Sequence, residues 1–205
     1  MKKNIILQFL VLLLILIISI TALSLYNIRD VTIKSTVSNA NLISEVVKSG
    51  LTSHMTNNKT EDIENFLNSI IKISNVKDVW IVRSENLNKQ FNKANFKLAK
   101  DELDRDVLLS GISKYKVHEN FSSSSLRITI PFKATNQNGI SCTNCHNVKE
   151  GDTIAALSMV LDISTIKESG LKSSYTILFI AIFSLIIFYF FSTQIMKPYL
   201  SLYRK

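Results

Sequence analysis

Residues 76–83 read Val-Lys-Asp-Val-Trp-Ile-Val-Arg, a run rich in β-branched and aromatic side chains that predicts a β-strand. Three later segments have the same character: residues 115–119, residues 126–132 (LRITIPF) and residues 154–161 (IAALSMVL). The polar residues Ser122 to Ser125 predict the turn between the first two of these. Together the four runs indicate a small antiparallel sheet, although the pattern leaves the order of its strands open.

Helical patterns flank these strands on both sides. Residues 27–55 carry one apolar stripe at spacings of three and four, made of Val37, Ala40, Ile43, Val47 and Leu51. A second helix is expected from Thr60 to Ile71, with acidic residues in its first turn, and a third from Asp101 to Gly111. A fourth is expected to begin near Ser164. The fold class is therefore α+β, with an antiparallel sheet flanked by helices.

Two long apolar runs lie outside this region. Residues 5–26 and residues 175–195 contain 22 and 21 residues, enough at 1.5 Å per residue to cross a hydrocarbon core of about 30 Å. Lys2, Lys3 and the small residues near Ala22 also fit a cleaved signal peptide, but the apolar part of such a peptide is usually only about 7–15 residues long. The second run is too long and too uniformly apolar for a core helix. We expect two transmembrane helices.

The chain has two cysteines, and both lie in the segment Cys142-Thr143-Asn144-Cys145-His146. This C-x-x-C-H spacing is the attachment signature of c-type haem: the two thiols form thioether bonds to the haem vinyl groups, and the adjacent histidine binds the iron. A structural disulfide, a thioredoxin-type redox pair and a zinc site are alternatives. The zinc site would need a further ligand from His54 or His118. We expect one covalent haem c held by Cys142, Cys145 and His146.

The haem motif also decides the topology. Lys2 and Lys3 precede the first span, and Lys197, Arg204 and Lys205 follow the second, which favours cytoplasmic tails. Cations near the other ends of the spans weaken this charge argument. Because c-type haem is attached outside the cytoplasmic membrane, the segment between the spans is expected in the periplasm. The predicted organisation is a cytoplasmic tail (1–4), a span (5–26), a periplasmic haem domain (27–174), a second span (175–195) and a cytoplasmic stub (196–205).

The net charge of +8 does not indicate a nucleic-acid partner. Five of the 24 Lys and Arg residues lie in the two tails, and the others are scattered among 16 Asp and Glu residues without forming a basic patch. The positive balance is therefore mainly a signal of membrane topology.

Residues 76–162 resemble a known family of sensor domains. The segments VWIVRSE, DELDRDVL, LRITIPFKA, CTNCHNVKEGD and IAALSMVLDIS are similar, in this order, to the haem c-containing, PAS-like periplasmic sensor domains of bacterial chemoreceptors, histidine kinases and cyclic-di-GMP enzymes. The resemblance implies a PAS-like sheet and a signal-input function. The stretch Lys197-Pro198-Tyr199-Leu200 resembles the start of the linker helix that leads to the output domain of such receptors.

The second axial position of the iron has four candidates between the spans: His54, Met55, His118 and Met159. Met159 lies in a strand pattern that favours core packing, and His118 fits a solvated strand position. In similar sensor domains the N-terminal helix tends to supply this ligand, which favours His54 or Met55. Neighbouring helical residues point about 100° apart, so only one of them can face the iron. We expect Met55, with His54 or water as alternatives.

These observations predict a membrane-anchored sensor in which the redox state of the haem, or a small ligand on it, changes the packing of the helices that enter the membrane. The expected partners are the membrane, a second copy of the chain in a homodimer, and a cytoplasmic signalling partner or a redox partner. A membrane-anchored monohaem electron-transfer cytochrome is the alternative. No acid/base constellation accompanies the haem motif, so an enzyme is not expected.

Overall fold

The computed structural model describes residues 2–57, 59–73, 75–91, 98–120, 123–136 and 141–202. In chain order, its elements are α1 (Lys2–Thr56), η1 (Thr60–Asp62), α2 (Ile63–Ile71), β1 (Val76–Arg83), α3 (Glu85–Gln90), α4 (Glu102–Ser110), β2 (Lys114–Glu119), β3 (Ser124–Lys133), η2 (Cys142–Asn144), β4 (Thr153–Asp162) and α5 (Ser164–Leu202), where η marks a short 3-10 helix. The chain forms two compact units, residues 33–164 and residues 1–32 with 165–205.

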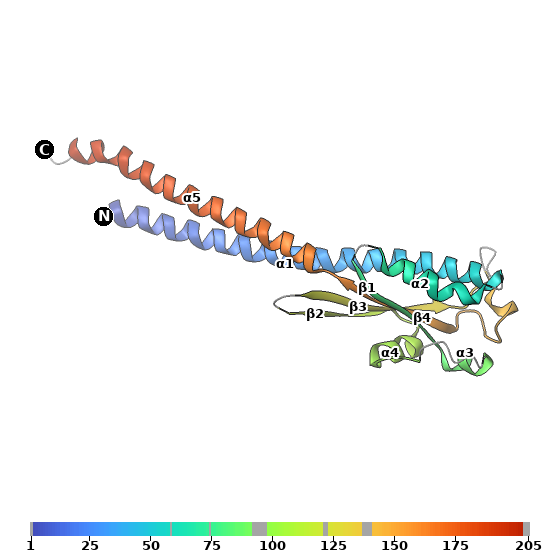
Figure 1. Cartoon of the computed structure of the whole chain (residues 1–205). Coiled ribbons are helices and arrows are strands. Elements are labelled where there is room, and N and C mark those ends of the chain that lie inside the picture. Colours follow the sequence, from blue (N-terminus) through green and yellow to red (C-terminus); the bar gives the residue numbers. More distant parts are fainter. Residues whose placement is uncertain are drawn as a thin grey trace. The chain divides into compact units, whose positions relative to one another are not determined.

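The second unit consists of the outer parts of α1 and α5, labelled in Figure 1. Two helices of the described chain, Gln8–Thr56 and Ser164–Ser192, are long and apolar enough to cross a membrane. The side chains in their apolar windows are almost all exposed, as expected of helices whose whole circumference is hydrophobic. The prediction of two long apolar helices is therefore confirmed.

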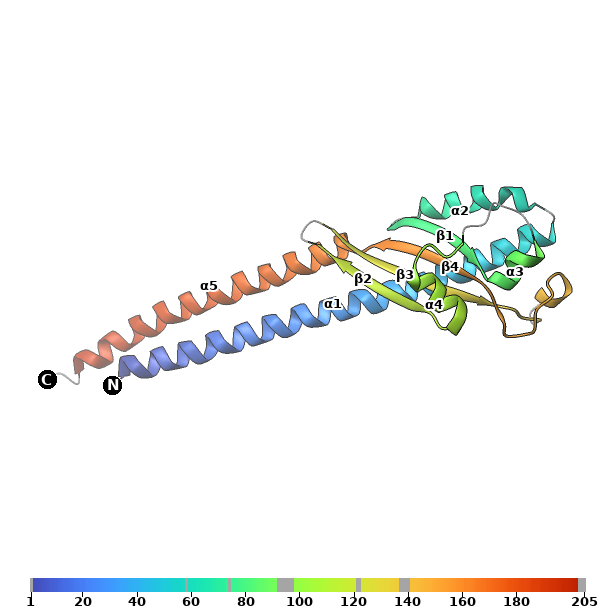
Figure 2. The same cartoon turned by 90° about the horizontal axis from the view of Figure 1, so that it is seen from below.

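The first unit is built on a four-stranded antiparallel sheet with the order β1-β4-β3-β2. The strand that is last in sequence lies between the first and the third: Arg83 of β1 is paired with Ala155 of β4, and Ala155 is paired in turn with Phe132 of β3. This α+β core agrees with the predicted fold class, and the four strands fall where the sequence placed them. Helices cover both faces of the sheet, with α1 and α2 on one side and α4 on the other (Figures 1 and 2).

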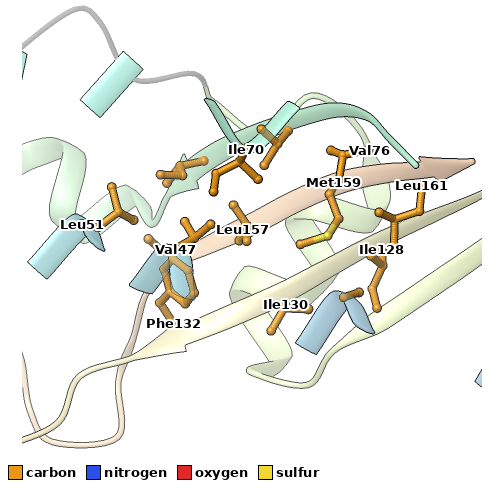
Figure 3. Packing of buried hydrophobic residues seen from close by; sticks show 14 of the residues in the cluster. Val47, Leu51, Ile70, Val76, Ile128, Ile130, Phe132, Leu157, Met159 and Leu161 are labelled. Carbon is orange, nitrogen blue, oxygen red and sulfur yellow. The ribbon is translucent and has the colours of Figure 1, made fainter. Parts of the chain in front are cut away.

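The face beneath α1 and α2 carries the larger apolar core (Figure 3). Ala40, Val47 and Leu51 of α1 are buried in it, with Val37 and Ile43 packed at its edge. The apolar stripe seen in the sequence therefore packs against the sheet of its own chain. Figure 3 shows Val47 and Leu51 on the same side of this core as Phe132, near the end of β3.

The opposite face is built around a buried carboxylate. Asp104 of α4 is fully buried and accepts hydrogen bonds from five donors: Trp80 Nε1 (3.2 Å), the Lys100 backbone N–H (3.0 Å), Arg127 Nη2 (2.6 Å), Thr129 Oγ1 (3.0 Å) and Ser158 Oγ (2.5 Å). Burial opposes ionisation of this carboxyl group, but the hydrogen bonds from Ser158, Arg127 and Lys100 outweigh it and lower its pKa. Asp104 therefore joins α4 to β1, β3 and β4 through one ionised group.

The helices were predicted less completely than the strands. The helix expected from the first span onward is continuous with it in α1, and Asp101 caps α4 through its side chain while Gly111 ends it at φ +63°. The short helix α3 was not predicted, because its polar sequence ENLNKQ has no apolar period. The compact unit, 33–164, is narrower than the predicted domain, 27–174. Ser122 of the predicted turn, and the tail residues Arg204 and Lys205, lie outside the described residues.

Hydrogen bonds fix the junction between β4 and α5. The Ser164 side chain accepts from the backbone N–H of Ser124 (2.8 Å) and donates to the Ser124 carbonyl oxygen (3.2 Å). The Asp162 carboxylate accepts from the Ser164 backbone N–H (2.8 Å), which caps the first turn of α5. The start of the exit helix is thus held to the beginning of β3.

Candidate functional site

The three residues of the haem motif lie together on one turn. Cys142 begins η2, a 3-10 helix of one turn. The carbonyl oxygen of Cys142 accepts hydrogen bonds from the backbone N–H groups of Cys145 (3.3 Å) and His146 (2.9 Å). The turn lies in the connection from β3 to β4. The structure therefore brings the predicted residues Cys142, Cys145 and His146 into a common local unit.

Hydrogen bonds within the connection hold the chain on both sides of this turn. Before it, Cys142 N–H donates to the carbonyl oxygen of Thr135 (3.0 Å), and the Asn136 side chain accepts from the hydroxyl groups of Ser141 (3.2 Å) and Thr143 (2.8 Å). After it, the Asp152 carboxylate accepts from the Lys149 N–H (2.8 Å), a side-chain hydrogen bond to a nearby backbone group that is common in turns.

The short helix α3 holds the same segment from the side. The Gln90 amide donates to the carbonyl oxygen of Asn147 and accepts from the N–H of Asn147, both at 2.9 Å. The next residue, Phe91, places its ring edge-on to the imidazole of His146, with centroids 5.2 Å apart and planes at 80°. The end of α3 and the residue after it thus contact the side chain of His146 and the backbone of its neighbour.

The chemical state of these groups suits haem attachment. Both thiols are free, with Cys142 half-buried and Cys145 exposed. Burial and the positive charge of Arg83 lower the pKa of His146, so its imidazole is neutral at neutral pH, the form that can bind a metal ion. Its Nδ1 atom is buried and has no hydrogen-bond partner within the described part of the chain. Two free thiols beside a neutral imidazole fit the needs of covalent haem.

The described residues contain no arrangement that would form a metal site from protein side chains alone. Among the described residues, no group of three or more His, Cys, Asp or Glu side chains is arranged to hold a metal ion. His118, one of the two alternatives for the further ligand of a zinc site, is exposed on β2 and paired with Ser125 at the start of β3, whereas Cys142 follows the end of β3. The sheet therefore separates His118 from the cysteines.

The four candidates for the second axial ligand fall into two pairs. Met159 is fully buried in the core under α1, as expected, and His118 lies at the far end of the sheet. His54 and Met55 lie at the end of α1, which Figures 1 and 2 place at the same end of the sheet as the connection from β3 to β4. The His54 ring packs at 5.5 Å from that of Phe66 on α2, and the Met55 side chain is 39% exposed.

Comparison with known protein families and with curated proteins found no match. The functional reading therefore rests on the residues of the site themselves.

Two site residues were missed in the sequence, Gln90 and Phe91. The available signal was Ser84, whose side chain accepts from the Leu87 N–H (3.3 Å) and caps α3 directly after β1. A Ser followed by an acidic residue at the end of a strand predicts a helix start. That signal places the helix, but it does not say that residue 90 meets residue 147.

Proposed function

We propose that this chain is a membrane-anchored, non-enzymatic sensor with one covalent haem c in a periplasmic, PAS-like domain. The observation that carries the proposal is the turn from Cys142 to His146, which presents two free thiols and a neutral imidazole in a single connection of the sheet. The four-stranded antiparallel sheet with helices on both faces is consistent with the PAS-like resemblance of the sequence.

Each of the three motif residues, Cys142, Cys145 and His146, has its own role in this proposal. The thiols of Cys142 and Cys145 form the thioether bonds, and the imidazole of His146 is the first axial ligand. When bound, the haem supplies an iron that changes oxidation state and binds small ligands. Met55 is proposed as the second axial ligand, because the end of α1 and the turn share one end of the sheet.

The way the turn is connected to the helices favours sensing over electron transfer alone. β4 leads from the turn to Asp162, and Ser164 begins the exit helix while bonded to the start of β3. A change at the turn can therefore be carried to α5 along the 10 residues of β4, which is paired with a strand on each side, and α1 connects the same core to the other span. Packed elements of this kind change between discrete arrangements.

The alternative is a membrane-anchored monohaem electron-transfer cytochrome, and the exposure of Cys145 favours it, since a haem attached there would have an accessible edge. The two functions differ in their need for coupling. Spin labels on unnatural residues at Asn41 and Ser169 should report different distances in the ferric, ferrous and CO-bound chain if it is a sensor. Equal distances in all three states, with rapid electron exchange to a soluble cytochrome, favour the cytochrome.

Covalent haem is tested first. The full chain, exported together with a haem-maturation system, should give a haem-stained band on denaturing gels, and Cys142→Ser or Cys145→Ser should weaken or abolish that band. Asn144→Ala, an exposed position in the same turn without a thiol, is the matched control and should retain it. A colourless, correctly exported wild-type chain contradicts the proposal. In the same preparations Met55→Leu should change the absorption spectrum of the ferric haem, whereas His54→Leu should not.

A further inference from the structure

The side chain of Gln90 makes two hydrogen bonds of opposite sense to one peptide unit. Its Nε2 donates to the Asn147 carbonyl oxygen and its Oε1 accepts from the Asn147 N–H, both at 2.9 Å, across 57 positions of sequence. A primary amide offers a donor and an acceptor side by side in this way, whereas an ionised carboxylate offers acceptors alone. The peptide that it holds follows directly after His146, so the contact limits the backbone that carries the imidazole.

The residue after Gln90 contacts the imidazole itself. The ring of Phe91 lies edge-on to His146, at 80° and 5.2 Å, in the T-shaped arrangement that aromatic pairs prefer. Phe91 N–H donates to the Leu87 carbonyl oxygen (3.3 Å), so Phe91 is tied to the end of α3. The last residue of α3 and the residue that follows it therefore contact the His146 segment at two places, the following peptide and the ring.

α3 is itself well anchored. Leu87 is buried, Ser84 caps the helix, and the Ser84 N–H donates to the carbonyl oxygen of Ile154 on β4 (3.0 Å). The helix follows β1 without an intervening loop, and β1 is paired with β4 along its length. The amide of Gln90 thus connects the His146 segment to the sheet by a route separate from the chain's own path through Lys133 and Thr153.

We infer that Gln90 is a positioning residue that sets the orientation of His146 toward the haem iron by holding the Asn147 peptide. This rests on the proposed function, in which His146 is an axial ligand. Gln90 acts through the hydrogen bonds between its side-chain amide and the backbone of Asn147, and it needs no contact with the haem. Groups around an iron-binding histidine determine its orientation and hence the properties of the metal.

The experiment compares variants of the full, haem-loaded chain. Gln90→Ala removes both hydrogen bonds, and Gln90→Glu keeps the acceptor but loses the donor. Lys89→Ala is the matched control, because Lys89 is the exposed neighbour on α3 and pairs with the exposed carboxylate of Glu85 (2.9 Å), away from the His146 segment. The readouts are haem staining, the exchange rate of the Asn147 amide proton and the iron–histidine stretching frequency of the ferrous haem. The stretching frequency is measured in a Met55→Leu background, which leaves the second axial position open so that the iron–histidine band can be observed.

Both Gln90 variants should retain the haem-stained band, because the cysteines are unchanged, while the iron–histidine band shifts or splits. The Asn147 amide should exchange about three- to tenfold faster in Gln90→Ala, the range expected for loss of one net hydrogen bond. Lys89→Ala should match the wild type in all three readouts. A haem-loaded Gln90→Ala chain with an unchanged iron–histidine band overturns the inference alone. A wild-type chain without covalent haem overturns the proposed function, and the inference with it.

Discussion

At the scale of single residues, Asp104 shows how the sheet accommodates a buried charge. An ionised carboxylate without partners would be very costly in the interior, but five donors from four different segments surround this one. Two of its neighbours also contact the indole of Trp80: Arg127 lies 4.3 Å and Lys100 Nζ 3.5 Å from the ring centroid. The cluster therefore links charge, hydrogen bonding and aromatic packing on the α4 face.

Asp104→Asn should destabilise the chain by about 3–5 kcal/mol, since it leaves the guanidinium of Arg127 buried without its closest carboxylate. The exposed residue Asp106 lies on the same helix and pairs with Lys114, so Asp106→Asn should cost about 0–1 kcal/mol. Urea denaturation of the detergent-solubilised chain, followed by fluorescence of the single tryptophan, Trp80, measures both. Equal effects of the two variants would contradict the role given to Asp104.

The same residue predicts an acid dependence. The pKa of Asp104 in the folded chain lies below its ordinary value of 3.8, so over this range the unfolded chain binds more protons than the folded one. The stabilisation by Asp104 is complete above the unfolded pKa and is lost as the pH falls through the lowered, folded pKa. Denaturation midpoints measured from about pH 6 to pH 3 should fall steeply below about pH 4 in the wild type. Asp104→Asn should flatten this part of the profile.

At the scale of elements, the contact between α1 and α2 depends on a missing side chain. Gly50 lies within α1, where glycine costs about 1 kcal/mol relative to alanine. A methyl group at this position would overlap the ring of Phe66, which also contacts His54. The close approach of the two helices near the candidate axial ligands therefore requires glycine here.

Gly50→Ala should destabilise the chain although alanine is the better helix former. Overpacking costs about 1–3 kcal/mol, which exceeds the gain of about 1 kcal/mol in helix propensity. Phe66→Leu in the same chain should recover part of the loss by making room for the methyl group. Ser49→Ala, on the exposed side of the same turn, should stay within about 0.5 kcal/mol of the wild type in thermal denaturation. A stabilising Gly50→Ala would show that α2 can move away at no cost.

At the scale of the whole molecule, the predicted homodimer needs a surface other than the stripe seen in the sequence. Leu42 and Val46, one turn apart on α1, are 65% and 59% exposed. On the proposed topology they lie 16 and 20 residues beyond the end of the first span at Tyr26, about 24–30 Å along the helix, where lipid would not cover them. We propose that a second copy does, because two parallel copies in one membrane present the same helix face to each other.

Leu42→Glu, and likewise Val46→Glu, should then reduce self-association in membranes, measured by crosslinking at exposed lysines. Asn41→Glu adds the same single charge to the same turn but about 100° from Leu42, and should leave association unchanged. An equal loss in both would point to a general effect of charge rather than to this face of α1.

Topology is a separate prediction at this scale. Reporter fusions after residue 205 should show cytoplasmic activity, and fusions after residue 92 should show periplasmic activity, because the tail cations favour the cytoplasmic side and haem c is attached outside it. The reverse pattern would exclude haem attachment together with the proposed orientation.

Local patterns in the sequence were sufficient for the strands, for most helix bounds and for the grouping of Cys142, Cys145 and His146, because periodicity, capping and motif spacing act over a few residues. Tertiary structure alone decided which surface the Val37-to-Leu51 stripe covers, that β4 lies between β1 and β3, and that Asp104 is buried beneath α4. It also brought Gln90 to Asn147 across 57 positions. Such pairings depend on how the whole chain shares its buried surface, and no short stretch of sequence carries that information.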